Sequence, residues 1–180
     1  DGATIGGGAA NAIQTNASYA TVGGGTANAA TGPGSFIGGG GWDALSVGGN
    51  AASGRASVIT GGHANTADGD YATLGGGKEN TIQTNASYAT IAGGWANDIR
   101  VNAYFGAIGG GYDNNIADSA DYSVIAGGYR NDIGADAYSG AIGGGFDNNI
   151  AASSQYATIP GGRWNSAANY GFAAGNRAKA

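Results

Sequence analysis

Two sets of regularly spaced residues could bind a ligand or hold repeats together. Aromatic residues recur every 17 positions in the set Trp95, Tyr112, Tyr129 and Phe146. Rings spaced in this way could form an apolar strip that stacks on sugar rings, a structural ladder, or a contact between subunits. Asparagine recurs at the same spacing, at Asn80, Asn97, Asn114, Asn131, Asn148 and Asn165. Stacked amides bond one another in cross-β assemblies, so this second set predicts a structural ladder.

Residues that carry out catalysis are scarce. His63 is the only histidine, and the sequence has no cysteine. A hydrolytic triad would therefore depend on this one imidazole, and neither a thiol nucleophile nor a His- or Cys-based metal cluster can be built. A calcium-binding nonapeptide array is disfavoured as well, because the glycine-rich segment 109–118 belongs to a period of 17 rather than nine residues. We expect no enzymatic activity, no cofactor and no bound metal.

The composition limits the kind of fold that can position these residues. The 180 residues include 39 glycines, whereas Leu, Ile, Val and Phe together supply only 25 residues. Such small side chains cannot fill a thick core, yet a net charge of −5 is too low for typical disorder. The isoelectric point near 4.4 argues against nucleic acid as a partner. No apolar run approaches the roughly 18 residues of a membrane span, so we expect no membrane insertion.

The sequence is built of repeats, and stacking of the repeats can stabilise a chain of such small residues. Ten Gly-Gly pairs divide the chain, and they are separated by 17 residues in most intervals, by 15 in two, and by 22 between Gly39 and Gly61. An aliphatic residue precedes each pair by two positions, and Asn or Asp follows it by three. A helical repeat is rejected, because each glycine costs about 1 kcal/mol in a helix. The sequence predicts an all-β parallel β-solenoid of about ten coils, each with two short strands joined by turns.

One repeat domain is expected over residues 1–180, with an irregular coil at 41–60 and a variant coil at 160–180. Counting from the glycine pair places Asp43 in the asparagine set of the irregular coil. It also places Leu45 at the position two residues after the asparagine, where most other coils carry isoleucine. The additional residues there are either a loop on the binding face or a plain correction of register.

The segment before each glycine pair is apolar on both faces. It reads aromatic, small residue, Thr/Ala/Val, Ile, so a pleated strand would direct the aromatic ring and Ile to opposite sides. Strands that are apolar on both faces are usually buried on both, which favours an oligomer. We therefore predict that a column of tyrosines is mostly buried, at a subunit contact or a coil corner; its members are Tyr19, Tyr71, Tyr88, Tyr122 and Tyr156.

Two motifs resemble known repeats. The C-terminal segment 172–180, FAAGNRAKA, resembles the head repeat x-A-x-G-x-x-A-x-A of trimeric autotransporter adhesins, and segment 47–57 resembles it more loosely. The unit at 88–97, YATIAGGWAN, is similar to the YATIGGGxxN arrays of bacterial surface proteins and phage-type fibres. The resemblance implies a left-handed β-roll, a homotrimer, and a place in an extracellular, cell-surface or virion fibre.

These observations predict a structural fibre segment, with or without adhesion to a glycan or protein of a host surface. The alternative is a carbohydrate-binding solenoid that uses the strip from Trp95 to Phe146. Ice binding is a lesser alternative, because the threonine column Thr4, Thr21, Thr73, Thr90 and Thr158 is interrupted by Phe36, Val58, Ala107, Val124 and Ala141. Since little covers the strand edge at 3–6, we also expect that the chain continues in a longer protein or that rods stack end to end into filaments.

Overall fold

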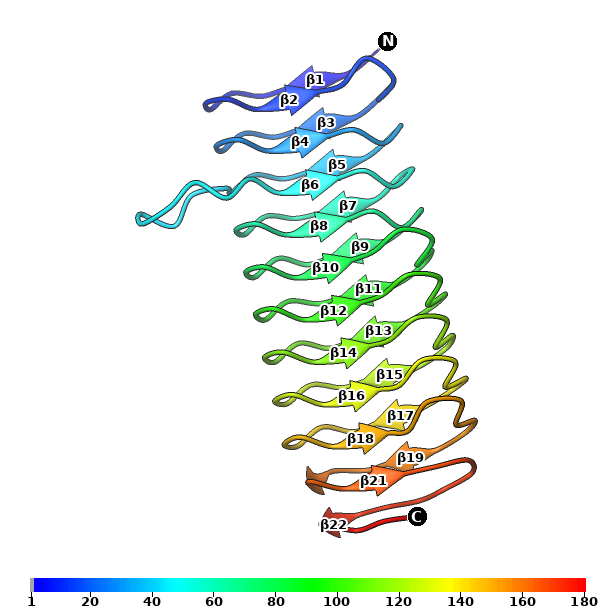
Figure 1. The fold of residues 1–180 in the computed structure, drawn as a ribbon. Coiled ribbons are helices and arrows are strands. Elements are labelled where there is room, and N and C mark those ends of the chain that lie inside the picture. The colour runs from blue at the N-terminus through cyan, green and yellow to red at the C-terminus, as the bar shows by residue number, and fades with distance from the viewer. Residues whose placement is uncertain (1) are drawn as a thin grey trace.

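The protein is a straight stack of coils (Figure 1). The computed structural model describes residues 2–180, and within them it contains two ten-stranded parallel sheets and no α-helix. The two termini lie at opposite ends of the stack. Within the same residues, no helix has the length and apolar character needed to span a bilayer. The predicted all-β parallel solenoid of about ten coils is confirmed.

Each coil contributes one two-residue strand to each sheet. The first sheet contains β1 (Thr4–Ile5), β3 (Thr21–Val22), β5 (Phe36–Ile37), β7 (Val58–Ile59), β9 (Thr73–Leu74), β11 (Thr90–Ile91), β13 (Ala107–Ile108), β15 (Val124–Ile125), β17 (Ala141–Ile142) and β19 (Thr158–Ile159). The second contains β2 (Ala12–Ile13), β4 (Ala29–Ala30), β6 (Ala51–Ala52), β8 (Thr66–Ala67), β10 (Thr81–Ile82), β12 (Asp98–Ile99), β14 (Asn115–Ile116), β16 (Asp132–Ile133), β18 (Asn149–Ile150) and β21 (Ser166–Ala167). A short third sheet pairs β20 (Gly162–Arg163) with β22 (Gly175–Asn176) near the C-terminus.

The interior is a single apolar layer between the two sheets. In the two ten-stranded sheets the second residue of each strand points inward. From β3 to β19 in the first sheet and from β4 to β21 in the second, these side chains are fully buried. Most are isoleucine, and alanines from the corners fill the remaining space. Because the layer is thin, a chain with few large aliphatic residues can still close its core.

Glycine allows the coils to approach one another at the corner after the first sheet. Gly111 has a φ of 92°, and a Cβ there would lie 2.2 Å from the carbonyl oxygen of Gly128 in the next coil. No side chain fits at that distance, so the second glycine of the repeated pair is a requirement of coil stacking.

Coils of 15 and 17 residues differ in the corner that leads from the second sheet to the first. Nine positions separate Ile82 from Ile91, but only seven separate Ala52 from Ile59. The three coils with the short corner carry alanine at the inward position of the second sheet, in β4, β6 and β8. In one short corner, a Cβ on Gly69 would lie 3.4 Å from Cγ2 of Ile82 in the next coil. A short corner and a small inward residue thus occur together in these three coils.

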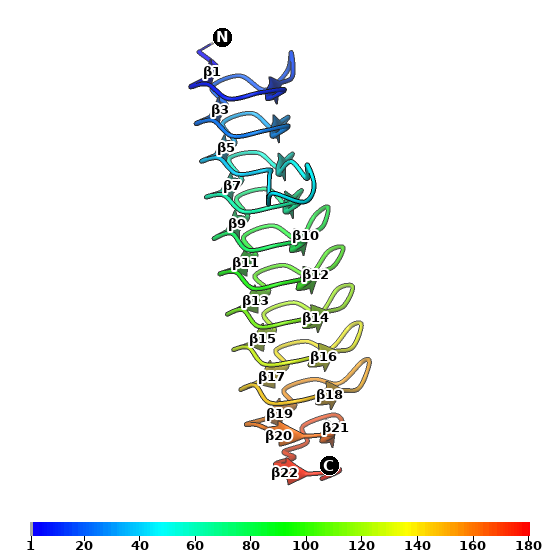
Figure 2. The ribbon, with the colours of Figure 1, turned by 90° about the vertical axis from the view of Figure 1, so that its left-hand side faces the viewer.

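The irregular coil is a 15-residue coil with a seven-residue hairpin inserted before its asparagine. Trp42 and Val47 form an antiparallel bridge, and the amide of Gly48 donates to the carbonyl of Gly41. The hairpin projects from the stack in Figure 1 and bends along the following coils in Figure 2. The assignment of Asp43 and Leu45 to coil positions was wrong. Counting from the glycine pair ran into the insertion, whereas Asn50 and Ala52 resume the coil beyond it.

Candidate functional site

The asparagine column forms a continuous buried ladder. In a typical rung, Nδ2 of Asn114 donates to Oδ1 of Asn97 and to two glycine carbonyls, each at 3.0 Å. Its own Oδ1 accepts from the backbone N–H and the Nδ2 of Asn131. The same pattern joins Asn11, Asn28, Asn50, Asn65, Asn80, Asn97, Asn114, Asn131, Asn148 and Asn165. These amides are satisfied by the protein itself, so they stabilise the stack and are not free to bind a ligand.

The aromatic strip Trp95, Tyr112, Tyr129 and Phe146 lies on the surface, each ring one coil from the next. Ring centroids are 4.7 Å apart for Trp95 and Tyr112, 5.2 Å for Tyr112 and Tyr129, and 4.9 Å for Tyr129 and Phe146. The last pair is stacked at 5°, whereas Trp95 is turned by 62° relative to Tyr112. Stacking covers ring faces, so the strip presents mainly ring edges at its C-terminal end.

Polar groups hold Trp95 at one end of this strip and Trp164 beyond its other end. The indole N–H of Trp95 donates to Oε2 of Glu79 at 3.0 Å. At the other end, Trp164 meets Phe146 edge to face, and the guanidinium groups of Arg163 and Arg177 lie 4.6 and 4.9 Å from its ring centroid. These contacts fix the orientation of the two indoles.

A second and longer run of rings, which we term the tyrosine ladder, follows the corner between the second sheet and the first. It consists of Tyr71, Tyr88, Phe105, Tyr122, Tyr138, Tyr156 and Tyr170. Successive centroids are 5.0–5.9 Å apart, and the first four rings are stacked within 10°. Sequence reasoning missed its continuity, because Ser139 occupies the expected position and the neighbouring Tyr138 fills the gap.

The prediction that the tyrosine column is buried at a coil corner was wrong. The rings of Tyr19, Tyr71, Tyr88, Tyr122 and Tyr156 are 43–73% exposed. Each has a φ between 55° and 61°, so the backbone there is a left-handed turn and not the extended strand that the pattern indicated. The turn directs the ring away from the coil. Burial of these rings at a subunit contact stays a prediction.

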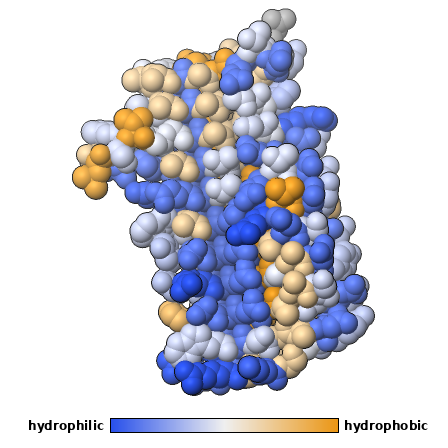
Figure 3. Space-filling model, viewed as in Figure 1, coloured by the Kyte–Doolittle hydropathy of each residue, from blue (hydrophilic) through white to orange (hydrophobic). Residues whose placement is uncertain are grey.

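The outer face of the second sheet is polar from β8 to β21, whereas β2, β4 and β6 carry alanine there. Figure 3 shows a hydrophilic band over the polar part. Asp98, Asn115, Asp132 and Asn149 alternate along the column. Asp132 accepts from both neighbouring asparagines, and Gln83 donates to both oxygens of Asp98. Desolvation raises the pKa of Asp98 despite these bonds and the nearby Arg100. The alternation of acid and amide avoids adjacent like charges.

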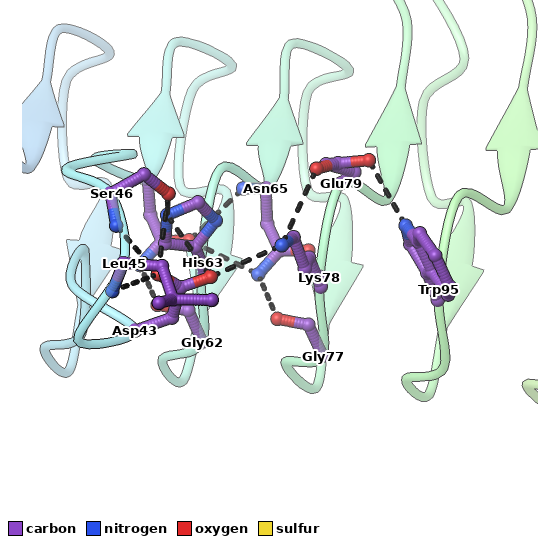
Figure 4. A network of polar contacts seen from close by, with 11 residues as sticks. Asp43, Leu45, Ser46, Gly62, His63, Asn65, Gly77, Lys78, Glu79 and Trp95 are labelled. Carbon is purple, nitrogen blue, oxygen red and sulfur yellow. Dashed lines mark hydrogen bonds and ion pairs between the residues drawn. The ribbon is translucent and has the colours of Figure 1, made fainter.

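The hairpin is tied to the rod by a polar network (Figure 4). Oδ1 of Asp43 accepts from the amides of Leu45 and Ser46, while its Oδ2 accepts from Nζ of Lys78 at 3.1 Å. The amide of Ser46, then Lys78, hold the pKa of Asp43 well below its usual range. The tip remains outside, and Leu45 is 93% exposed.

The arrangement around His63 differs from a hydrolytic triad. Ser46 Oγ lies 3.1 Å from Nε2, and Oδ2 of Asp43 lies 3.9 Å from the same nitrogen. A triad needs the carboxylate on Nδ1, but Nδ1 of His63 is buried without a hydrogen-bond partner. The histidine therefore supports the hairpin.

The candidate site is a surface. The described residues, 2–180, enclose no pocket, and they gather no group of three or more acidic or histidine side chains that could hold a metal ion. The aromatic strip and the tyrosine ladder are two exposed features that run along several coils. A scan of the chain against models of known protein families finds no match, and a search of curated proteins finds none either.

Proposed function

We propose that this chain is a structural rod in an extracellular or surface fibre, and that it works as a homotrimer. The observation that carries this proposal is the unbroken stack itself. Two sheets and a ten-membered asparagine ladder run through the same coils, so the molecule is stiff along one axis. Regular columns on its outside repeat at each coil, which suits lateral packing of identical rods. Adhesion to a host glycan or protein would be an addition to this role.

The test is the mass and shape of the protein in solution. Light scattering is expected to give three times the chain mass of 17.3 kDa. Electron microscopy should show rods about 50 Å long, from ten coils at roughly 4.8 Å each. A monomer at every concentration would contradict the homotrimer, and a compact rounded particle would contradict the rod.

Carbohydrate binding on the aromatic strip is the second candidate. It is favoured by Trp95, whose half-exposed ring departs from the stack and is held in one orientation by Glu79. A rigid aromatic face beside a carboxylate is suited to a sugar ring. On a glycan array, Trp95→Ala with Tyr112→Ala should abolish binding, while Phe36→Ala, which removes an exposed ring outside both runs, should retain it. Equal binding by both variants would exclude the strip.

A further inference from the structure

The backbone of the tyrosine ladder is strained, and contacts within the single chain do not offset this strain. Six of its seven members have a φ of 55–61°, a region that bulky side chains rarely adopt. Yet these side chains are not buried in return, because the seven rings remain 39–68% exposed. Ring stacking compensates only in part. Strained, exposed aromatic residues point to a function outside the coil.

The coil closes without an aromatic residue at this corner. Gly34 and Ala56 occupy the equivalent position in two short coils, with the same hydrogen bond to the preceding coil. A second left-handed corner position holds small or polar residues, namely Asn85, Asn102, Ser119, Asp136 and Ser153. Asn and Asp tolerate this conformation best among non-glycine residues. Folding alone therefore does not explain the choice of tyrosine.

The exposed area of the ladder matches the requirement of a specific interface. With about 200 Å² per aromatic residue, the exposed fractions leave about 700 Å² of ladder surface uncovered. Specific interfaces use about 800 Å² from each partner. The ladder thus supplies nearly one full side of such an interface.

We propose that the tyrosine ladder packs against the same ladder of the other two copies in the proposed homotrimer, with the three rods parallel around a three-fold axis. This rests on the proposed assembly and names the surface that forms it. The argument for further copies of this chain is periodicity, because rings 5.0–5.9 Å apart over seven coils are matched by another ladder of the same rise. A partner without this repeat would fit only locally.

The charges beside the ladder predict how the contact responds to salt. Asp70 and Asp121 directly precede ladder residues, and Asp136 lies two positions before Tyr138. Arg55 pairs with Asp70 at 3.8 Å, and Asp121 accepts from the amide of Tyr104. Parallel copies bring identical carboxylates toward one another, so association should strengthen as ionic strength rises and screens the repulsion.

The test compares two matched double variants. Tyr88→Asn with Tyr122→Asn removes two central rings but places a residue that tolerates the left-handed turn, so the coil should still close. Tyr112→Asn with Tyr129→Asn removes two rings from the aromatic strip and serves as the control. Circular dichroism establishes folding, and light scattering at several protein and salt concentrations gives the dissociation constant of the assembly.

We expect at least a tenfold weaker assembly for the ladder variant, with the control unchanged and the wild type strengthened by salt. An assembled ladder variant would overturn the inference while leaving the proposed fibre role intact. A wild type that is monomeric throughout would overturn both. Assembly that weakens with salt would indicate an ion-paired interface elsewhere and also contradict the ladder. If the central variant does not fold, Tyr71→Asn with Tyr156→Asn replaces it under the same criteria.

Discussion

Two groups of coils close the same two sheets with inward side chains of different volume. One group contains β4, β6 and β8, and the other contains the second-sheet strands from β10 to β18. The first group has seven positions in one corner and alanine at the inward position of the second sheet. The second group has nine positions and isoleucine there. We infer that a longer corner widens the coil and that the larger side chain fills the added space. Corner length and core volume therefore have to change together.

The asparagine ladder does not change between the two groups. Asn65 in a short coil and Asn114 in a long coil make the same amide and carbonyl hydrogen bonds at 2.9–3.1 Å. The ladder lies at the corner opposite the one that varies. The corner with the asparagine ladder thus keeps its stacking geometry in both groups, while the opposite corner varies in length by two residues and carries the tyrosine ladder.

The largest expected effect comes from removing the long coil's inward side chain without shortening its corner. Ile116→Ala should leave a cavity and lower the free energy of unfolding by about 2–5 kcal/mol. Denaturant unfolding measures this change. Val124→Ala, on the outer face of the neighbouring strand, is the control and should cost less than about 0.5 kcal/mol. If Ile116→Ala also cost less than about 0.5 kcal/mol, the coil would have closed the cavity by itself. That result would contradict the link between corner length and the volume of the inward side chain.

The sequence was sufficient for the fold because its period is set by backbone contacts. Gly111 and its equivalents cannot carry a side chain, so the glycine pair marks each coil directly. Counting failed at Asp43, since an insertion between the glycines and Asn50 leaves no local sign of where the coil resumes. The exposure of Tyr88 could not be predicted either, because a left-handed turn at a bulky aromatic residue runs against its backbone preference.

The second-largest effect is expected in the asparagine ladder, which the short and the long coils share. Asn65→Ala and Asn114→Ala should destabilise the protein equally, by about 1–3 kcal/mol for each buried partner left without a hydrogen bond. Thermal or denaturant unfolding of the two variants, side by side, provides the comparison. Asn149→Ala, on the outer face of the second sheet, should have a much smaller effect. A clear difference between Asn65→Ala and Asn114→Ala would show that the ladder depends on corner length.

A third prediction converts a short coil with an inward alanine into a long coil with an inward isoleucine. Ala52→Ile alone should overpack the short coil and cost about 1–3 kcal/mol. Replacing residues 53–58 by the corner sequence of residues 83–90 lengthens that corner by two residues and should recover most of the loss. Unfolding free energies of the single change and of the combined change decide the matter. If the combined change does not recover the unfolding free energy lost in Ala52→Ile, corner length and core volume are independent of each other.

The smallest effect is expected at the hairpin, which is inserted in one of the short coils and projects from it. The lowered pKa of Asp43 means that its charge favours the docked hairpin. This contribution is present above the ordinary pKa of 3.8 and is lost as the pH falls toward the lowered value. Asp43→Asn keeps an oxygen that can accept from the amide of Ser46 but removes the ion pair with Lys78.

Hydrogen exchange at neutral pH should therefore be faster at the Ser46 amide in Asp43→Asn, with global unfolding unchanged. The reason is that the hairpin is added to a complete 15-residue coil, whose ladder residue Asn50 and inward Ala52 lie beyond it. Asp113→Asn, which removes an exposed contact with Arg130 at 3.6 Å, controls for the loss of one carboxylate and should leave exchange at Ser46 unaltered. If Asp43→Asn lowered global stability as far as the Asn114→Ala change, the hairpin would have to be part of the coil's own closure, and the seven inserted residues would count as core structure.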